Sequence, residues 1–341
     1  MKKILAVLKY VFFLGAGIFL VWWQFHKMTP EQEVKFQYAL SNVNFWLIIP
    51  IVLMSLTSHL SRSCRWKILI EPLGYQPLII NIFGVTMVGY LANSFVPRLG
   101  EILKCTLLGK YEKIAPQKLI GTIIIERIFD LICYLVFIFF TVLIQYKLVG
   151  GFVKNNISEL FKNNGGVPVW IKLLIIVSAI VLIILFIKWL VKKYQHNSIV
   201  QKIKKFIAGL SEGLATIKNL KKRGWFLFNT LLIWSMYLLQ IYIGFSAIKD
   251  VSHLGLDAAC AVLTLATLAM IITPGGLGTF PTAVYLVSQL YKIDTAVGEA
   301  FGWLMWGVST AIILISGLIF SGILFFINKK KHIEKRTNYS R

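Results

Sequence analysis

The chain has 341 residues, of which 57% are hydrophobic and 15% are charged, and its formal net charge is +22. Soluble domains carry about 25% charged residues, and the mean hydropathy of this chain is +0.74. These values exclude an ordinary soluble enzyme and favour a helical protein that crosses a membrane several times. Basic cytoplasmic loops that follow the positive-inside rule explain the positive charge better than a nucleic-acid partner does.

Six apolar segments approach or exceed the length of about 20 residues that a membrane-spanning helix needs. The first follows Lys2 and Lys3, but it is too long for a signal peptide and lacks a small-residue cleavage site. We therefore expect full spans at residues 4–25, 45–60, 119–144, 170–191, 225–248 and 298–327.

Two further apolar regions, residues 78–108 and 256–290, are each interrupted near the middle by proline and glycine. The first interruption is Pro97-Arg98-Leu99-Gly100, and the second is Pro274-Gly275-Gly276-Leu277-Gly278. Irregular backbone at membrane depth is tolerated only where protein or water satisfies it. We therefore expect both tips to face a polar cavity, although proline and glycine that merely kink two ordinary spans are an alternative.

Basic residues predict the orientation of the chain. The loop 192–224 has nine lysines and arginines against one acid, Glu212, so we expect it in the cytoplasm together with the basic tail 329–341. Arg62, Arg65 and Lys67 predict a connection on the same side after the second span. The asparagine- and glycine-rich segment 147–168 is expected outside.

With this orientation, residues 78–108 must enter the membrane and return to the cytoplasmic face, and residues 256–290 must do the same from outside. Two interrupted segments that open to opposite faces of the membrane indicate inverted repeats around a binding site at the midplane. The predicted fold is an all-α polytopic integral membrane protein of residues 1–328. It has about six full spans and two re-entrant or broken helical hairpins, arranged as in an inverted repeat.

Charged residues occur within two of these apolar regions, at Arg98, Glu101 and Lys104 and again in Glu126-Arg127-Ile128-Phe129-Asp130. A charge near the bilayer centre costs about 2.5–3.5 kcal/mol on insertion scales. Three cations against three acids make the set neutral, as a paired network requires. We predict that Arg98 or Arg127 pairs with Glu101, Glu126 or Asp130 across two helices.

Such a network has two interpretations. It locks two helices together, or its cations bind a lipid phosphate while the carboxylates hold them in place or take a proton. A helix that starts after Pro97, and the glycines of the second tip, would add backbone donors for an anion. The candidate substrate-binding residues are Arg98, Glu101, Lys104, Glu126, Arg127, Asp130, Pro274, Gly275, Gly276 and Gly278.

The rest of the sequence predicts little chemistry. Apolar residues recur at helical spacing from Ile199 to Ile217 among lysines, which fits either an amphipathic helix on anionic lipid or a basic loop packed on the bundle. The four cysteines form no C-x-x-C pair, and no nucleotide-binding or hydrolase motif occurs. We expect no catalytic residue, no metal and no cofactor.

Three motifs resemble those of the lysylphosphatidylglycerol synthase/flippase transmembrane-domain family. They are Pro97-Arg98-Leu99-Gly100-Glu101, Glu126-Arg127-Ile128-Phe129-Asp130 and Pro274-Gly275-Gly276-Leu277-Gly278. Many members of that family have an acid soon after the glycine motif, where this sequence has Thr279-Phe280-Pro281. Larger members add a soluble aminoacyl-transferase domain, for which residues 329–341 leave no room.

The resemblance implies flippase-like movement of a phospholipid or lipid-linked headgroup, anionic or zwitterionic, between the leaflets of the inner (cytoplasmic) membrane. We expect a lipid transporter rather than an enzyme, with both termini in the cytoplasm. Two alternatives stay open. One is a membrane-embedded lipid-modifying transferase related to phosphatidylglycerol lysyltransferases, and the other is an accessory subunit of an envelope glycolipid or polysaccharide synthesis complex. The lipid, its direction of movement and the energy source are not predicted.

Overall fold

The computed structural model describes residues 2–96, 98–145, 218 and 220–339. Its contacts divide the chain into two units. Unit 1 contains residues 1–127 and 219–341, and unit 2 contains residues 128–218, of which 128–145 and Lys218 are described. Every described element is helical, which confirms the predicted all-α class.

Ten long helices make up the described chain, and helix α6 continues from unit 1 into unit 2 after Arg127. Four short 3-10 helices connect some of them: η1 (Phe45–Leu47), η2 (Glu71–Leu73), η3 (Lys249–Val251) and η4 (Pro274–Gly276). The long helices are α1 (Lys2–Lys27), α2 (Pro30–Ser41), α3 (Ile48–Ile70), α4 (Ile79–Phe95), α5 (Leu99–Glu112), α6 (Pro116–Ile144), α10 (Arg223–Ser246), α11 (Leu256–Ile272), α12 (Thr279–Leu290) and α13 (Thr295–Tyr339).

Local sequence sets several of these boundaries. Helix α2 begins with a capping box, in which the Thr29 side chain accepts a hydrogen bond from the Gln32 amide and the Gln32 side chain accepts one from the Thr29 amide. Pro30 occupies the first helical position, where its missing N–H costs nothing. After α3 and η2 the chain turns at Gly74, whose φ of 84° suits glycine.

Helices α4 and α5 form an antiparallel pair that we call hairpin 1. At its base, Glu112 Oε1 accepts hydrogen bonds from the Leu78 amide at 3.1 Å and from Asn81 Nδ2 at 2.6 Å. At its tip, the Gly100 amide donates to Asn93 Oδ1 at 2.7 Å. The start of α4 therefore meets the end of α5.

Helices α11 and α12 form hairpin 2, whose tip contains η4. Thr279 Oγ1, at the start of α12, donates to the Ala269 carbonyl of α11 at 2.9 Å and lies 2.7 Å from Thr273 Oγ1. Thr273 Oγ1 also donates to the Leu277 carbonyl at 2.9 Å. These hydroxyl contacts close the tip in place of an ion pair.

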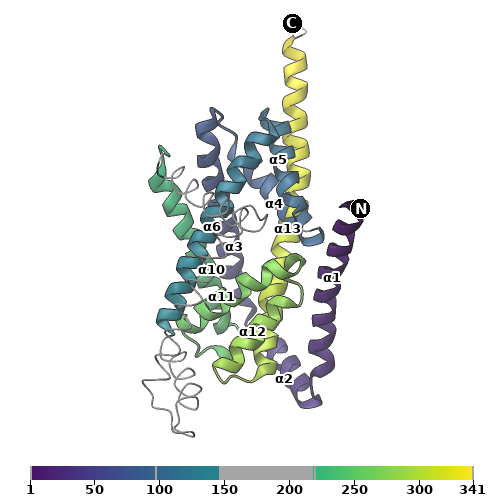
Figure 1. Cartoon of the computed structure of the whole chain (residues 1–341), viewed down its shortest axis with the longest axis vertical. Coiled ribbons are helices and arrows are strands. Elements are labelled where there is room, and N and C mark those ends of the chain that lie inside the picture. The colour runs from purple at the N-terminus through teal and green to yellow at the C-terminus, as the bar shows by residue number, and fades with distance from the viewer. Residues whose placement is uncertain (1, 97, 146–217, 219, 340–341) are drawn as a thin grey trace, which may run out of the picture. The chain divides into compact units, whose positions relative to one another are not determined.

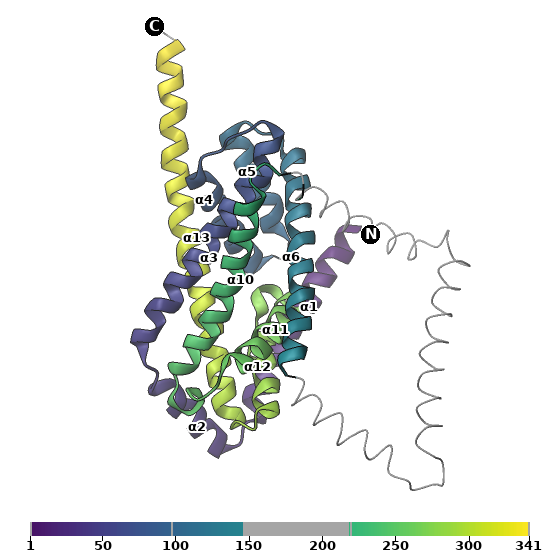
Figure 2. The ribbon, with the colours of Figure 1, turned by 90° about the vertical axis from the view of Figure 1, so that its left-hand side faces the viewer.

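The two hairpins lie toward opposite ends of unit 1 (Figures 1 and 2). Hairpin 1 follows α3, and hairpin 2 follows α10. Helices α4 and α11 have 17 residues each, which corresponds to about 25 Å at a rise of 1.5 Å per residue. Each arm is shorter than the ~30 Å hydrocarbon core of a bilayer.

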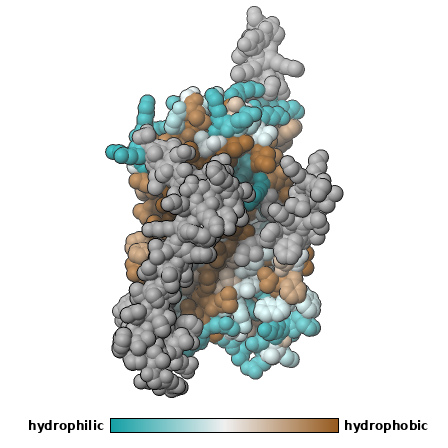
Figure 3. All heavy atoms as spheres, viewed as in Figure 1, coloured by the Kyte–Doolittle hydropathy of each residue, from teal (hydrophilic) through white to brown (hydrophobic). Residues whose placement is uncertain are grey.

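Apolar side chains cover much of the outer surface. Leu231 of α10 is 68% exposed, and Phe326 of α13 is 70% exposed. On the face that Figure 3 shows, apolar residues occupy the middle and hydrophilic residues gather at the two ends. By length and composition, four segments of the described chain can cross a membrane: Phe45–Leu73, Pro116–Ile144, Arg223–Ser246 and Thr295–Lys329. This pattern is that of a multi-pass membrane protein.

Most predicted boundaries agree with the helices. The predicted spans 4–25, 119–144, 225–248 and 298–327 correspond to α1, α6, α10 and part of α13, and the predicted hairpin 256–290 matches α11 and α12. The predicted span 170–191 and the segment 199–217 lie outside the described residues, as does nearly all of the loop 192–224.

Three predicted boundaries are wrong. The second span does not end at residue 60, because α3 continues to Ile70. Hairpin 1 extends past residue 108 to Glu112, where that carboxylate caps the start of α4. Helix α13 runs without a break to Tyr339, so the boundary predicted at residue 328 does not coincide with a helix end. In each case polar residues continue a helix, since lysine, arginine and glutamate are good helix formers.

Candidate functional site

Four charged side chains meet inside unit 1, where α3, α5 and α6 pack together. We call them the charged cluster: Arg62, Arg65, Lys104 and Glu126. Arg65 and Glu126 are fully buried, and Lys104 and Arg62 are 3% and 8% exposed. Charges this deeply buried must be paired or hydrogen-bonded to be tolerated.

Glu126 is the centre of this cluster. Its Oε1 atom lies 3.2 Å from Arg62 Nη1 and 3.3 Å from Arg65 Nη2. Its Oε2 atom lies 3.6 Å from Lys104 Nζ. One carboxylate from α6 thus holds two cations of α3 and one cation of α5.

Helix α10 holds the two arginines from the other side. Arg62 Nη2 donates to Tyr237 Oη at 3.2 Å, and Arg65 Nη1 donates to Thr230 Oγ1 at 3.3 Å. Each guanidinium therefore uses one nitrogen on Glu126 and another on a hydroxyl of α10. These bonds orient the planar forks of both side chains.

Aromatic rings enclose the remaining sides of the cluster. Lys104 Nζ lies 4.5 Å from the centre of the Trp66 ring, and Trp66 Nε1 donates to Thr122 Oγ1 at 2.8 Å. The Arg65 guanidinium lies 5.7 Å from the centre of the Phe226 ring. Cation–π contacts of this kind stabilise charges away from water.

The prediction that Arg62 and Arg65 follow the second span in a cytoplasmic loop is wrong. Both lie within α3, on a stripe that also carries Ser55, Ser58 and His59, all of them buried. The spacing of three and four residues along this stripe is that of one helix face. This spacing is the signal by which the sequence could have placed both arginines in the bundle.

A second ion pair lies beside the charged cluster, as the sequence predicted. Arg127 Nε of α6 lies 3.1 Å from Glu101 Oε1 of α5, and these side chains are 42% and 36% exposed. Glu101 is three residues before Lys104, and Arg127 follows Glu126. The predicted pairing of Arg127 with an acid of another helix is confirmed, and the pair lies at the accessible edge of the cluster.

Arg98 does not join either group. It precedes the first residue of α5 with a φ of 67°, is exposed, and forms no ion pair within the described residues. Asp130 lies one turn beyond Glu126 on α6, in unit 2. Of the charged residues that the sequence singled out in unit 1, Arg98 therefore lies apart: Lys104 and Glu126 join Arg62 and Arg65, and Glu101 pairs with Arg127.

The tip of hairpin 2 depends on glycine conformations. Gly275, Gly276 and Gly278 have φ values of 62°, 73° and 72°, which L side chains rarely adopt. The Gly276 amide already donates to the Thr273 carbonyl, so the predicted backbone donor for an anion is engaged within the tip. Pro274 is buried in this turn.

Helices α1 and α13 hold this tip through its carbonyl groups. Gln24 Nε2 donates to the Gly278 carbonyl at 3.2 Å, and Trp306 Nε1 donates to the Gly275 carbonyl at 2.9 Å. The two hairpin tips also meet, since a Cβ atom added at Gly275 would lie 3.8 Å from Ser94 Cα of α4. The structure therefore brings the glycine motif beside hairpin 1, next to Ser94.

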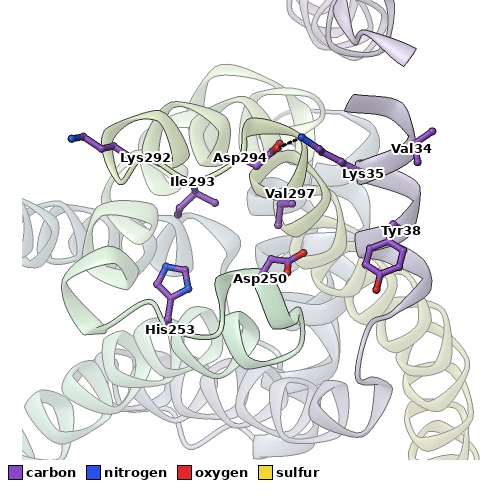
Figure 4. A pocket seen from close by; sticks show the side chains of 9 residues that line it. All are labelled: Val34, Lys35, Tyr38, Asp250, His253, Lys292, Ile293, Asp294 and Val297. Atoms are coloured by element: carbon purple, nitrogen blue, oxygen red, sulfur yellow. Dashed lines mark hydrogen bonds and ion pairs between the residues drawn. The ribbon is translucent and has the colours of Figure 1, made fainter. Parts of the chain in front are cut away.

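A cavity of about 480 Å³ lies at the base of hairpin 2, where α2, η3 and the α12–α13 turn meet (Figure 4). Figure 4 shows the ion pair between Lys35 and Asp294 at its rim, with a distance of 3.0 Å between Lys35 Nζ and Asp294 Oδ2. Hydrogen bonds to Glu31 and to Asp294 raise the pKa of Lys35 above its ordinary value. Burial opposes ionisation of Asp294, but bonds from Lys35 and the Ala296 amide lower its pKa overall.

The chemistry of the two regions differs. The charged cluster has guanidinium and ammonium donors suited to phosphate or carboxylate oxygens, whereas the cavity has a mixed, largely exposed lining. Among the described residues, no group of three or more histidine, cysteine, aspartate and glutamate side chains is placed to hold a metal ion. The charged cluster and the neighbouring Arg127–Glu101 pair therefore form the candidate site, in which the cations contact the Glu126 and Glu101 carboxylates.

Comparisons with known proteins agree with the fold and the motifs. A UPF0104 membrane protein of Methanocaldococcus jannaschii is 27% identical over 320 residues, which cover 87% of this chain and 89% of that protein. A second UPF0104 membrane protein of this organism is 26% identical over 260 residues, which cover 72% of this chain and 97% of that protein. No solved structure matches the chain.

The family model described as lysylphosphatidylglycerol synthase TM region matches residues 6–327, a range that contains both hairpins and the charged cluster. The chain therefore belongs to the family of lysylphosphatidylglycerol synthase transmembrane regions.

Proposed function

We propose that this protein moves the polar headgroup of a phospholipid or lipid-linked compound between membrane leaflets. One observation carries the proposal: charged side chains gather along a short helical hairpin within a bundle whose outer faces are apolar. An intramembrane ionisable group is costly and usually serves a function. Membership of the family is consistent with handling of phospholipid.

In this proposal both hairpins are re-entrant. Hairpin 1 opens to the cytoplasm, hairpin 2 opens to the outside, and their tips meet near the midplane. Transporters with inverted repeats place their substrate sites at such junctions of broken helices. The basic loop 192–224 and the lysines at the end of α13 then put both termini in the cytoplasm, by the positive-inside rule.

The substrate is an anionic or zwitterionic headgroup that carries a phosphate, and its acyl chains stay in the bilayer. Exposed Arg98 at the tip of hairpin 1 makes the first contact. The part-exposed Arg127 receives the phosphate next, because a guanidinium fork matches two phosphate oxygens. Lys104 and the buried arginines lie one helical turn further in.

The test is lipid exchange in proteoliposomes with variants of Arg98. Because Arg98 is exposed and has no ion pair in the described chain, Arg98→Gln should leave the free energy of unfolding within about 0.5 kcal/mol of wild type. It should abolish most exchange, and Arg98→Lys should retain part of it, since lysine keeps the charge but loses the fork.

Lys110→Gln is the matched control. Lys110 is an exposed cation on α5, as Arg98 is at its start, but it lies at the opposite end of that helix. Exchange at the wild-type rate in Arg98→Gln and Lys110→Gln alike would contradict the role of Arg98. Turnover of the headgroup in place of exchange would favour a lipid-modifying transferase, and neither activity would favour an accessory subunit.

A further inference from the structure

Glu126 is surrounded in a way that an ordinary helix–helix ion pair is not. Three cations from two helices share its two oxygens, at 3.2, 3.3 and 3.6 Å. A carboxylate and a phosphodiester present the same feature to an arginine fork, two oxygens that share one negative charge. The Glu126 side chain therefore occupies the position that a phosphate anion would take among these cations.

The arginines are held independently of Glu126. Tyr237 and Thr230 of α10 accept a hydrogen bond from Arg62 and Arg65, respectively, on the side away from the carboxylate. If Glu126 moved away, both guanidinium groups would keep these anchors. Buried guanidinium groups need such bonds in any role, and here the bonds would keep both arginines in place while the anion beside them changes.

A part-exposed ion pair lies beside the cluster. The part-exposed Arg127–Glu101 pair contributes the residue next to Glu126 on α6 and the residue one turn before Lys104 on α5. Lys104 lies within electrostatic range of Arg127, and its distance to Glu126 is the longest of the three.

We propose that Glu126 is a placeholder anion: a lipid phosphate displaces it from Arg62, Arg65 and Lys104, and the displaced carboxylate takes up a proton. This inference rests on the proposed lipid translocation and specifies its substrate class and coupling. A buried carboxylate without its cations costs several kcal/mol as an ion and becomes neutral instead.

The step balances in charge and atoms. One phosphodiester anion binds the three cations, and one proton from water at the same membrane face converts the Glu126 carboxylate to a carboxylic acid. On release at the other face, the proton leaves and Glu126 returns to the cations. One negative lipid and one proton cross together, so no net charge moves.

Other titratable groups around Glu126 must be separated from it in the test. The arginines keep their charge at all accessible pH values. His59 is the competing proton acceptor, because its imidazole can take up a proton and it lies on α3 one turn from Arg62. Its ring lies 5.1 Å from that of Tyr90. The groups that interact electrostatically with Glu126 or with its cations are His59, Arg62 and Arg65 on α3, Tyr90 on α4, Glu101, Lys104 and Cys105 on α5, Arg127 on α6 itself, and Tyr237 on α10.

The experiment uses the full chain in vesicles of phosphatidylcholine with a trace of fluorescent phosphatidylglycerol. A membrane-impermeant reductant reports the leaflet of the probe, and an internal dye reports proton movement. With the interior one pH unit more alkaline, one-to-one coupling predicts about tenfold enrichment of the probe in the inner leaflet, since one pH unit is 1.36 kcal/mol. A potassium diffusion potential at equal pH should leave the probe evenly distributed.

Two variants locate the proton. Glu126→Gln should exchange phosphatidylglycerol without a response to the pH gradient, and His59→Gln should keep the wild-type response. A pH response that survives in Glu126→Gln, or that disappears in His59→Gln alone, overturns the placeholder role.

The wild-type protein tests the placeholder role of Glu126 even if Glu126→Gln does not fold. Exchange in wild type that ignores the pH gradient, or that follows the membrane potential, overturns the inference and leaves the proposed function in place. No exchange in wild type, with phosphatidylglycerol or with the phosphatidylcholine itself as the labelled probe, overturns both.

Discussion

Hairpins 1 and 2 have the same shape and are stabilised by different chemistry. Hairpin 1 carries Lys104 and Glu101, which reach Glu126 and Arg127 of α6 through ion pairs. Hairpin 2 is closed by the hydroxyls of Thr273 and Thr279 and by glycines with positive φ. Hairpin 1 therefore contributes charged side chains to the bundle, and hairpin 2 contributes a glycine-rich backbone turn beside it.

The glycine motif of hairpin 2 is followed by Thr279, which is not an acid. This agrees with the difference between the hairpins. Family members often have an acid shortly after the glycines, and this chain has Thr279 at that place. Thr279 donates to the Ala269 carbonyl and contacts Thr273. These contacts hold α12 against α11.

The largest expected difference between the hairpins is the side of the membrane from which their bases can be labelled. If both are re-entrant from opposite faces, cysteines at Gln76 and Gln117, which flank hairpin 1, should label only from the cytoplasm. Cysteines at Ser252 and Gln289, at the base of hairpin 2, should label only from outside. All four positions are exposed. Labelling of Gln76→Cys and Gln117→Cys from opposite sides would mean that residues 78–112 cross the membrane, and the re-entrant topology would be wrong.

The next effect is on stability, measured as the free energy of unfolding in detergent. Arg65→Met should lower it by about 1.5–3 kcal/mol, the value of a hydrogen bond to a charged group, because Arg62 and Lys104 still pair with Glu126. Thr279→Val in hairpin 2 should cost only about 1 kcal/mol, the net value of a neutral hydrogen bond.

Lys110→Met is the control for Arg65→Met, because it removes an exposed cation and should change stability by less than about 0.5 kcal/mol. Equal losses for Arg65→Met and Thr279→Val would remove the energetic distinction between the hairpins.

Both hairpins also contain glycines in close contact with the backbone of a neighbouring helix. Substitution of these glycines should have a smaller effect on the free energy of unfolding. A Cβ atom at Gly100 would overlap the Gly89 carbonyl oxygen of α4, and one at Gly278 would lie 2.6 Å from the Gly17 carbonyl oxygen of α1. We expect Gly100→Ala and Gly278→Ala each to lower the free energy of unfolding by about 1–3 kcal/mol through overpacking.

Gly121→Ala is the matched control, since nothing lies within 4 Å of an added Cβ there. It should keep or raise stability by up to about 1 kcal/mol, as alanine does in a helix. A loss in Gly121→Ala as large as in Gly100→Ala would show that the effect does not come from close packing.

The smallest expected effect is the pH dependence of the link between α2 and hairpin 2. The lowered pKa of Asp294 means that its contribution is present above the ordinary aspartate pKa of about 3.9 and is lost as pH falls through the folded value. The raised pKa of Lys35 means that its contribution persists throughout neutral pH and is lost only in strong alkali.

Asp294→Asn should therefore melt slightly below wild type at pH 7, and the two melting temperatures should converge in acid. Asparagine can still accept the Ala296 amide bond, so the variant removes only the charge. A difference in melting temperature that stays constant from pH 7 to strong acid would assign it to something other than ionised Asp294.

The linear chain was sufficient to predict the helical class, most spans, both hairpins and the pairing of Arg127 with an acid of another helix. These follow from local patterns: apolar length, proline and glycine at breaks, and the cost of an unpaired charge in a bilayer. The pattern failed where polar residues continue a helix, as at Arg62 and Arg65, because sequence hydropathy treats a buried, paired arginine as a loop residue.

Only the tertiary structure decided which charges meet. Lys104 and Glu126 are 22 positions apart, and Arg62 and Tyr237 are 175 apart. Their pairing depends on how α3, α5, α6 and α10 pack, which no local spacing encodes. Arg98 shows the converse: its motif placed it among the charges, but in the turn before α5 it is exposed and forms no ion pair within the described residues.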